Sequence, residues 1–401
     1  MSANQELPEI FRDLKTIDKD EKVVFCKNCT MSNQRPRIQF NEKGFCSACV
    51  FNEYKNKHVD WDKREKELSD VCDKFRKEDG TWDVIVPSSG GKDSSYVSYM
   101  LKEKYDMHPL TVSMAPGLPT QIGQQNLFNM SFTGQDNVLF TPNGIIHRKL
   151  SRESLIEFGD NFIPFAYGQI NIPLQCAVKF NVPFVIFGEN GELEYGGTIQ
   201  DYNRPTLRIS TIPSGKFSGL RTPGAASRLP NENWLPEGIK VEDVKFYLPP
   251  TQEELDKAKV ECYFYNYFEN WRPEEHVDIA KKYCNYKEGN ERTEGTYTDF
   301  ASLDDKTDGF HYYMMFIKLG IGRATSDSAH QVRHGLLTRD EGVELVQKFD
   351  GEFPNKYLKE FLEYMSITRE ELDSVFDKFR RDLIWKKDNN EWRLRHQISK
   401  L

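Results

Sequence analysis

The chain has 401 residues, of which 38% are apolar, 29% charged and 13% aromatic. This composition is that of a globular protein and does not indicate disorder, and the length predicts two or three domains. The formal net charge is −8 and no long basic block occurs, which counts against a general nucleic-acid binder. No apolar run is long enough to span a bilayer, and the first residues lack the layout of a secretion signal, so we expect a cytoplasmic protein.

The first predicted domain, residues 1–79, contains two CxxC pairs. Cys26 and Cys29 are followed, after 16 intervening residues, by Cys46 and Cys49. This spacing predicts tetrahedral Zn²⁺, and because four thiolates leave no open coordination position we expect a structural metal. An iron–sulfur cluster on the same cysteines is the alternative. A charged amphipathic helix is predicted from about Asp60 to Lys77.

The second predicted domain, residues 80–203, alternates short apolar strands with helical segments. The strands are predicted at Trp82–Pro87, Pro109–Met114, Val138–Phe140 and Pro183–Phe187. The helices are predicted near Ser94–Lys104, Ile122–Phe132, Ile145–Phe158 and Ile170–Phe180. This alternation is typical of a doubly wound, parallel α/β sheet.

The third predicted region, residues 204–401, opens with a Gly/Pro/Ser-rich stretch from about Arg204 to Gly238, which we interpret as a long loop or insertion. After it the chain is predicted to be mainly helical. Capping boxes with Thr-x-x-Glu spacing are predicted at Thr251–Glu254, Thr338–Glu341 and Thr368–Glu371. The basic tail from Lys378 to Lys400 is interpreted as an exposed helix face.

A glycine- and serine-rich loop follows the first predicted strand and opens a helix. It comprises Ser88, Ser89, Gly90, Gly91, Lys92, Asp93, Ser94 and Ser95. Two glycines allow a tight backbone turn whose N–H groups face an anion, and the helix N-terminus adds its positive end. The loop is therefore a predicted phosphate site, although it lacks the Walker A spacing.

The segment Ser89-Gly90-Gly91-Lys92-Asp93-Ser94 resembles the SGGxDS signature of the PP-loop ATP pyrophosphatases, whose fold is a HUP-type α/β sheet. The resemblance implies that residues 88–95 bind the pyrophosphate of ATP and that AMP is transferred to a carbonyl oxygen. Asp93 is expected to carry Mg²⁺, and Lys92 to help balance the charge on the phosphates.

Two further blocks are candidates for substrate binding. Glu189, Asn190, Glu194 and Tyr195 follow the fourth predicted strand, at the carboxyl edge of the sheet where ligands bind. Arg323, His330 and Arg333 lie in the block GIGRATSDSAHQVRHG, and guanidinium groups suit phosphate or carboxylate ligands. The alternatives are a solvated polar turn for the first block and an exposed basic helix face for the second.

Together, the paired CxxC start, PSSGGKDSS, GENGELEYGG and GIGRATSDSAHQVRHG resemble the N-acetyl sugar amidotransferase family, which forms acetamidino sugars in O-antigen and nonulosonic acid pathways. The resemblance implies that ATP adenylates the acetamido oxygen of a nucleotide-linked sugar or nonulosonic acid and that ammonia displaces AMP. It assigns Lys92, Asp93, Glu189 and Arg323 to catalysis. Ammonia is expected from a separate glutaminase subunit with a cyclase-like partner, because no glutaminase segment is evident.

Two alternatives remain open. A tRNA-modifying PP-loop enzyme, either a thiolation enzyme or a lysidine-type ligase, could combine CxxC pairs with this loop, but the acidic net charge counts against it. A zinc-bearing scaffold or ATP sensor would bind nucleotide without turning it over. The four remaining cysteines, Cys72, Cys176, Cys262 and Cys284, are interpreted as core residues.

Overall fold

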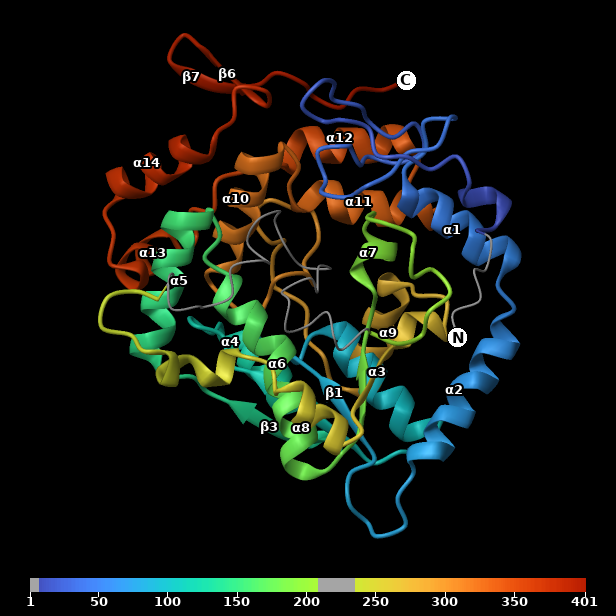
Figure 1. Cartoon of the computed structure of the whole chain (residues 1–401). Helices are drawn as coiled ribbons and strands as arrows, with labels where there is room; N and C mark the ends of the chain where they lie inside the picture. The colour runs from blue at the N-terminus through green and yellow to red at the C-terminus, as the bar shows by residue number, and fades with distance from the viewer. Residues whose placement is uncertain (1–6, 208–234) are drawn as a thin grey trace.

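The computed structural model describes residues 7–207 and 235–401, and its centre is a five-stranded parallel sheet (Figure 1). The strands are β1 (Val84–Pro87), β2 (Pro109–Met114), β3 (Asp136–Phe140), β4 (Phe184–Phe187) and β5 (Glu261–Phe264). Their order in the sheet is β3-β2-β1-β4-β5, and all neighbours run parallel. The strand order reverses beside β1, as in other doubly wound sheets. The predicted parallel α/β fold is confirmed.

The fifth strand comes from beyond the predicted end of the second domain at residue 203. Phe184 of β4 is opposite Glu261 of β5, and Phe187 is opposite Phe264. The sheet is thus completed only after the Gly/Pro/Ser-rich stretch, of which residues 208–234 lie outside the described part of the chain. This strand was not predicted, because the chain after the Gly/Pro/Ser-rich stretch was expected to be mainly helical.

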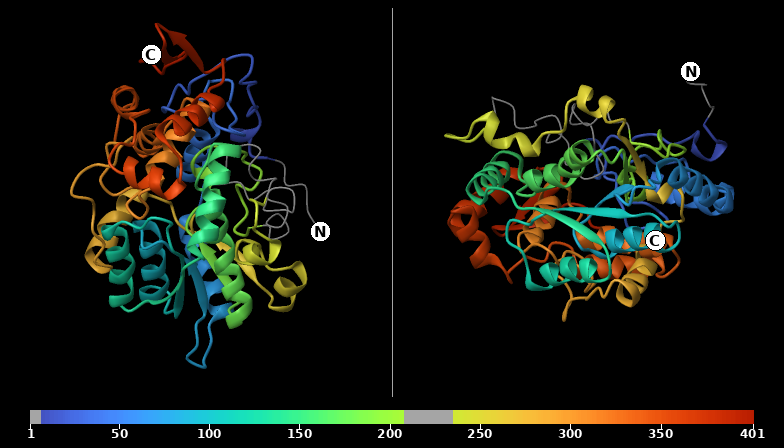
Figure 2. Two further views of the ribbon diagram at one scale, coloured as in Figure 1. Left: turned by 90° about the vertical axis from the view of Figure 1, so that its left-hand side faces the viewer. Right: turned by 90° about the horizontal axis from the view of Figure 1, so that it is seen from below.

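Helices cover both faces of the sheet (Figure 2). Helices α2 (Trp61–Phe75) and α3 (Lys92–Glu103) pack on one face, and α5 (Gly144–Phe158) and α6 (Ile163–Phe180) belong to the core of the other. Successive residues of β1 alternate between the two cores, with Ile85 on the α6 side. Helix α6 begins earlier than predicted, and Pro164 in its first turn is compatible with that start.

The cysteine segment packs against the C-terminal helices rather than standing apart. Helix α1 (Ser47–His58) begins directly after Cys46 and contains Cys49, and Figure 1 shows this blue segment beside the orange helices α11 (Arg323–Arg333) and α12 (Arg339–Phe349). Ile38 and Phe40 share a core with Ile321 and Ala329. The first and last parts of the sequence therefore form one layer above the sheet's carboxyl edge.

The remaining helices surround this framework. They are η1 (Glu9–Phe11), α4 (Gln121–Phe132), α7 (Gly191–Glu194), η3 (Val241–Tyr247), α8 (Gln252–Lys257), η4 (Tyr265–Tyr267), α9 (Pro273–Tyr283), α10 (Asp308–Leu319), α13 (Leu358–Met365) and α14 (Arg369–Phe379). All three predicted capping boxes are present, at the N-termini of α8, α12 and α14. Within the described ranges, no helix has an apolar stretch sufficient to cross a bilayer.

The interpretation of the C-terminal tail as a helix face is wrong beyond Phe379. Residues 385–394 form an antiparallel hairpin of β6 (Trp385–Asp388) and β7 (Glu391–Leu394). Asn389 and Asn390 both have positive φ, at 49° and 65°, which is the conformation a two-residue hairpin turn requires. The indole of Trp385 donates a hydrogen bond of 2.6 Å to the carbonyl of Ile317, which anchors the hairpin to α10.

Candidate functional site

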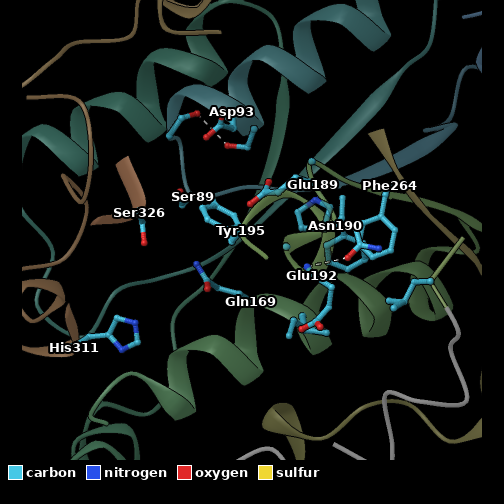
Figure 3. Close-up of a pocket in the computed structure, with 18 of the residues that line it drawn as sticks. Ser89, Asp93, Gln169, Glu189, Asn190, Glu192, Tyr195, Phe264, His311 and Ser326 are labelled. Atoms are coloured by element: carbon cyan, nitrogen blue, oxygen red, sulfur yellow. Dashed lines mark hydrogen bonds between the residues drawn. The ribbon is translucent and has the colours of Figure 1, made fainter. Parts of the chain in front are cut away.

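A cavity of about 510 Å³ opens at the carboxyl edge of the sheet (Figure 3). Its wall includes the segments that directly follow β1 and β4, as expected for a ligand site in an open parallel sheet. Of the residues predicted to bind or act on ligands, those on the wall are Ser88, Ser89, Gly91, Asp93, Ser94, Glu189, Asn190, Tyr195 and Arg323. In Figure 3, Asp93 and Ser89 lie on one side of the cavity, and Gln169 and His311 lie on the other.

The loop between β1 and α3 has the geometry of an anion site. Gly90 has a φ of +78°, and a Cβ atom there would lie 2.7 Å from the backbone of Leu127, so only glycine fits. The Ser88 hydroxyl accepts a 3.1 Å hydrogen bond from the Gly90 N–H and donates one of 2.9 Å to Ser94. No side chain in the described ranges caps α3 at Gly91. The first-turn N–H groups of α3 therefore face an approaching anion.

Two side chains, Lys92 and His276, hydrogen-bond to the carboxylate of Asp93. Its carboxylate accepts bonds from Lys92 Nζ at 2.5 Å and from His276 Nδ1 at 2.8 Å. Burial opposes ionisation, but Lys92 and His276 outweigh it and hold the pKa of Asp93 well below its usual range. A carboxylate in this state on a cavity wall fits the oxygen ligands that Mg²⁺ prefers.

The residue that orients Asp93 was not predicted. His276 lies on α9, and its ring stacks on Tyr96 at 4.1 Å and meets the edge of Trp271 at 4.3 Å between centroids. Its side chain is nearly fully buried. No local sequence signal could have identified it, because it is separated from Asp93 by 183 positions.

Glu189 faces the cavity from the segment after β4. Burial and the negative charge of Asp93 raise the pKa of Glu189 from 4.5 to about 7. A carboxyl group with a pKa near neutrality can both accept and release a proton at cellular pH. Asn190 next to it caps α7, accepting a 3.1 Å bond from the Glu192 N–H.

Arg323 enters the cavity from the first turn of α11. Its Nε donates a 3.0 Å hydrogen bond to Asp327, and its terminal nitrogen donates to the Tyr312 hydroxyl. Burial disfavours the charge, but Asp327 and Tyr312 more than compensate and raise the pKa of Arg323. Tyr312 and Ser326 line the same wall. The guanidinium is thus a fixed cation within a buried environment.

Three predicted substrate residues do not line the cavity. Glu194 forms a buried ion pair with Lys55 at 2.8 Å. Arg333 donates a 2.8 Å bond to the Glu194 carbonyl and approaches Cys29 Sγ at 4.0 Å. His330 is buried behind Tyr195, with ring centroids 4.7 Å apart. These three residues support the wall from behind.

The cavity also contains residues that the sequence did not single out. Arg35 and Arg37 reach it from the segment between the two cysteine pairs, and Arg37 forms a 2.5 Å ion pair with Glu192. On another part of the wall, Asp160 and His311 form a 2.8 Å pair. Arg35 and Arg37 could have been predicted as candidates from the sequence, because two arginines lie between the predicted metal ligands.

The four cysteines of the N-terminal segment converge on one point. All are buried, and their Sγ atoms lie within 4.8 Å of one another. The Cys26–Cys49 and Cys29–Cys46 distances are 3.8 and 3.7 Å. The Cys46 N–H also approaches Cys26 Sγ at 3.2 Å, as expected for a thiolate acceptor. Four convergent thiols without a disulfide form a metal-binding site.

One part of the chain is similar to a described family. Residues 294–399 match the family described as LPS biosynthesis protein WbpG-like, C-terminal domain. This match fits the predicted resemblance to the sugar amidotransferases, and the description of the matched family names lipopolysaccharide biosynthesis.

Two further comparisons give weaker likenesses. An uncharacterised protein of Methanocaldococcus jannaschii is 27% identical over 108 residues, which is 26% of this chain and 38% of that protein, so only part of the relative is spanned. The U34-tRNA thiolase NcsA from Methanococcus maripaludis, solved with its 4Fe-4S cluster, aligns at 14% identity over 69% of this chain and 79% of that chain. The TM-score of this alignment is 0.30.

Proposed function

We propose that this protein is a PP-loop enzyme that uses ATP to adenylate the acetamido oxygen of an N-acetylated sugar and then replaces that oxygen with ammonia. One observation carries the proposal. The segment related to lipopolysaccharide biosynthesis supplies Tyr312, Arg323 and Ser326 to the same cavity as the SGGKDS loop. A nucleotide site and a sugar-pathway domain thus share one wall.

The phosphate end of the cavity suits ATP. The uncapped N-terminus of α3 and the hydroxyls of Ser88, Ser89 and Ser94 supply donors for the pyrophosphate, and Lys92, which pairs with Asp93, adds positive charge nearby. The ionised Asp93 would hold Mg²⁺, which offsets phosphate charge when bound. His276 keeps that carboxylate oriented and ionised.

The rest of the cavity suits replacement of oxygen by nitrogen. Adenylation makes the acetamido oxygen part of a good leaving group. Ammonia then adds to the carbon and loses a proton, and the carbon–oxygen bond breaks to release AMP and leave an amidine. Glu189, with its raised pKa, is positioned to accept that proton, and Arg323 to stabilise negative charge on the phosphate that departs.

The cysteine site is proposed to hold Zn²⁺ as a structural ion. Zn–S bonds of about 2.3 Å in a tetrahedron require sulfur atoms about 3.8 Å apart. The two measured distances of 3.8 and 3.7 Å match that geometry, whereas a cluster of several iron atoms needs its thiolates further apart. The metal would fix the fold of the segment that carries Arg35 and Arg37.

Ammonia is proposed to come from a separate glutaminase with a cyclase-like channel subunit, in the cytoplasm. The acidic net charge supports a small-molecule substrate over tRNA. Direct use of ammonium ions in vitro would bypass the partner and allow the chain to be assayed alone.

The deciding experiment is an assay of AMP and pyrophosphate release with Mg-ATP, ammonium and a panel of N-acetylated nucleotide sugars and nonulosonic acids. Mass spectrometry should detect a loss of about one mass unit, the exchange of oxygen for NH. AMP release that depends on tRNA, without any change in a sugar, would favour the tRNA-modifying alternative. Nucleotide binding without AMP release under every condition would favour a sensor or scaffold.

A further inference from the structure

Arg35 is a cavity-lining cation without a carboxylate partner in the described ranges. Its Nε donates a 2.8 Å hydrogen bond to the carbonyl of Gly196. Within residues 7–207 and 235–401, its two terminal nitrogens make no hydrogen bond or ion pair. Arg35 is only partly exposed, and a cation in such a position is costly when it has no anionic partner.

The neighbouring acid is already engaged elsewhere. Glu192 accepts a 2.5 Å bond from Arg37 and a 3.2 Å bond from the N–H of Thr198. Glu192 is thus paired with Arg37, whereas Arg35 lines the cavity. Burial lowers the pKa of Arg35 to about 10, and the nearby charge of Glu192 offsets this only in part.

The position of Arg35 assigns it to the non-nucleotide part of the cavity. Its guanidinium lies 5.6 Å from the ring centre of Tyr195 and is tied to Gly196, both in the block after β4. The ATP phosphates have their own cradle, in which Lys92 and the α3 N-terminus supply positive charge. The ATP phosphates therefore leave Arg35 without an anionic partner, and a second anionic group in the cavity would supply one.

We propose that Arg35 binds an anionic group of the sugar substrate, either a carboxylate or a phosphate, and that the cysteine module holds it in place. A guanidinium with two free terminal nitrogens matches either anion bidentately. The inference rests on the proposed function, and it makes the N-terminal module part of the substrate site rather than only a stabilising element.

The cysteine module restrains Arg35 closely. The residue lies six positions after Cys29 and eleven before Cys46, so both ends of its segment are fixed by predicted metal ligands. Its N–H also donates a 3.2 Å bond to the carbonyl of Ser32 within the same loop. Removal of the metal should free this segment and weaken binding of the sugar more than binding of nucleotide.

The test measures binding calorimetrically to the full chain with metal. The probes are a UDP-linked N-acetylhexosamine, an N-acetylated 2-keto acid sugar, neutral N-acetylglucosamine and a non-hydrolysable ATP analogue. Arg35→Gln should weaken binding of one anionic sugar by about tenfold to a hundredfold, and Arg35→Lys by less. Binding of the ATP analogue should not change. The anionic probe that responds identifies phosphate or carboxylate as the ligand group.

Arg12→Gln is the matched control, because Arg12 is exposed on the same module and does not line this cavity. Metal content and thermal unfolding establish that each variant is folded. If Arg35→Gln weakens binding of the ATP analogue as much as binding of the sugar, the role of Arg35 is overturned but the proposed function is not. The same conclusion follows if the variant binds every sugar that the wild type binds with unchanged affinity. If the wild type binds no sugar, the proposed function fails first and the role of Arg35 fails with it.

Discussion

His276 Nδ1 lies 2.8 Å from Asp93 Oδ1, and this contact links α9 to the phosphate loop. The imidazole is enclosed by Tyr96 and Trp271, so it cannot turn away from the carboxylate without disturbing the core. Asp93 therefore has a fixed direction as well as a fixed charge. The arrangement resembles the outer-shell support that metal ligands commonly receive.

Asp93→Asn should abolish nucleotide chemistry while preserving the fold. We expect AMP release to fall by about a hundredfold or more, because the carboxylate proposed to hold the Mg²⁺ that offsets the phosphate charge is lost. His276→Phe keeps the stacked ring but removes the hydrogen bond, and it should lower kcat by about tenfold. Pyrophosphate release kinetics and circular dichroism measure both effects. Wild-type AMP release by Asp93→Asn would contradict the assignment of this residue.

Glu189→Gln should change how stability depends on pH. The pKa of Glu189 is raised from 4.5 to about 7 in the folded chain, so its neutral form is the favoured one. Its stabilising contribution is present below pH 4.5 and is lost as the pH rises through about 7. The Tm advantage of Glu189→Gln over wild type should therefore grow between about pH 5 and about pH 8. A constant difference in Tm over that interval would show that the carboxyl titrates normally.

Cys46→Ser should release the metal and destabilise the N-terminal layer. Metal analysis of the wild type is expected to give about one zinc per chain and no visible absorption band. Cys176→Ser is the matched control, because Cys176 is also a buried thiol but lies in the α5–α6 core. It should keep its metal and lose less stability. A brown protein containing iron would replace the zinc assignment with a cluster.

Glu194→Gln should lower stability and leave substrate binding intact. Lys55 and Glu194 have side-chain exposures of 2% and 4%, so neutralising one partner leaves the other charge buried. The expected loss is about 3–5 kcal/mol in the free energy of unfolding. Chemical denaturation measures the loss, and KM for the sugar measures binding. A raised KM with unchanged stability would return Glu194 to the substrate site, as the sequence first indicated.

Local sequence patterns predicted the parts of the site that depend on neighbouring residues. The loop from Ser88 to Ser95 could be recognised because a strand, two glycines and a helix start follow one another within a few positions. The four cysteines were recognisable for a similar reason, since metal geometry imposes short CxxC spacings. Capping boxes such as Thr338–Glu341 are equally local.

Contacts between distant segments were not predictable in this way. His276 reaches Asp93 across 183 positions, and β5 joins the sheet only after a long intervening stretch. The hairpin at residues 385–394 was predicted to be a helix, because its basic composition is compatible with either state; its turn is formed by two adjacent asparagines with positive φ. The spacing of apolar residues along the sequence does not show which distant segments come into contact.

Short-range patterns were enough to predict a phosphate-binding loop on a parallel sheet and a four-cysteine metal site, because backbone sterics and ligand spacing act over a few residues. Which polar side chains share the cavity could be seen only in the folded chain. Folding brought Arg35, Glu189 and Arg323 to one cavity and left Glu194, His330 and Arg333 outside its lining. Burial and charge pairing depend on packing between distant segments, and for this reason Glu194 pairs with Lys55 and not with a ligand.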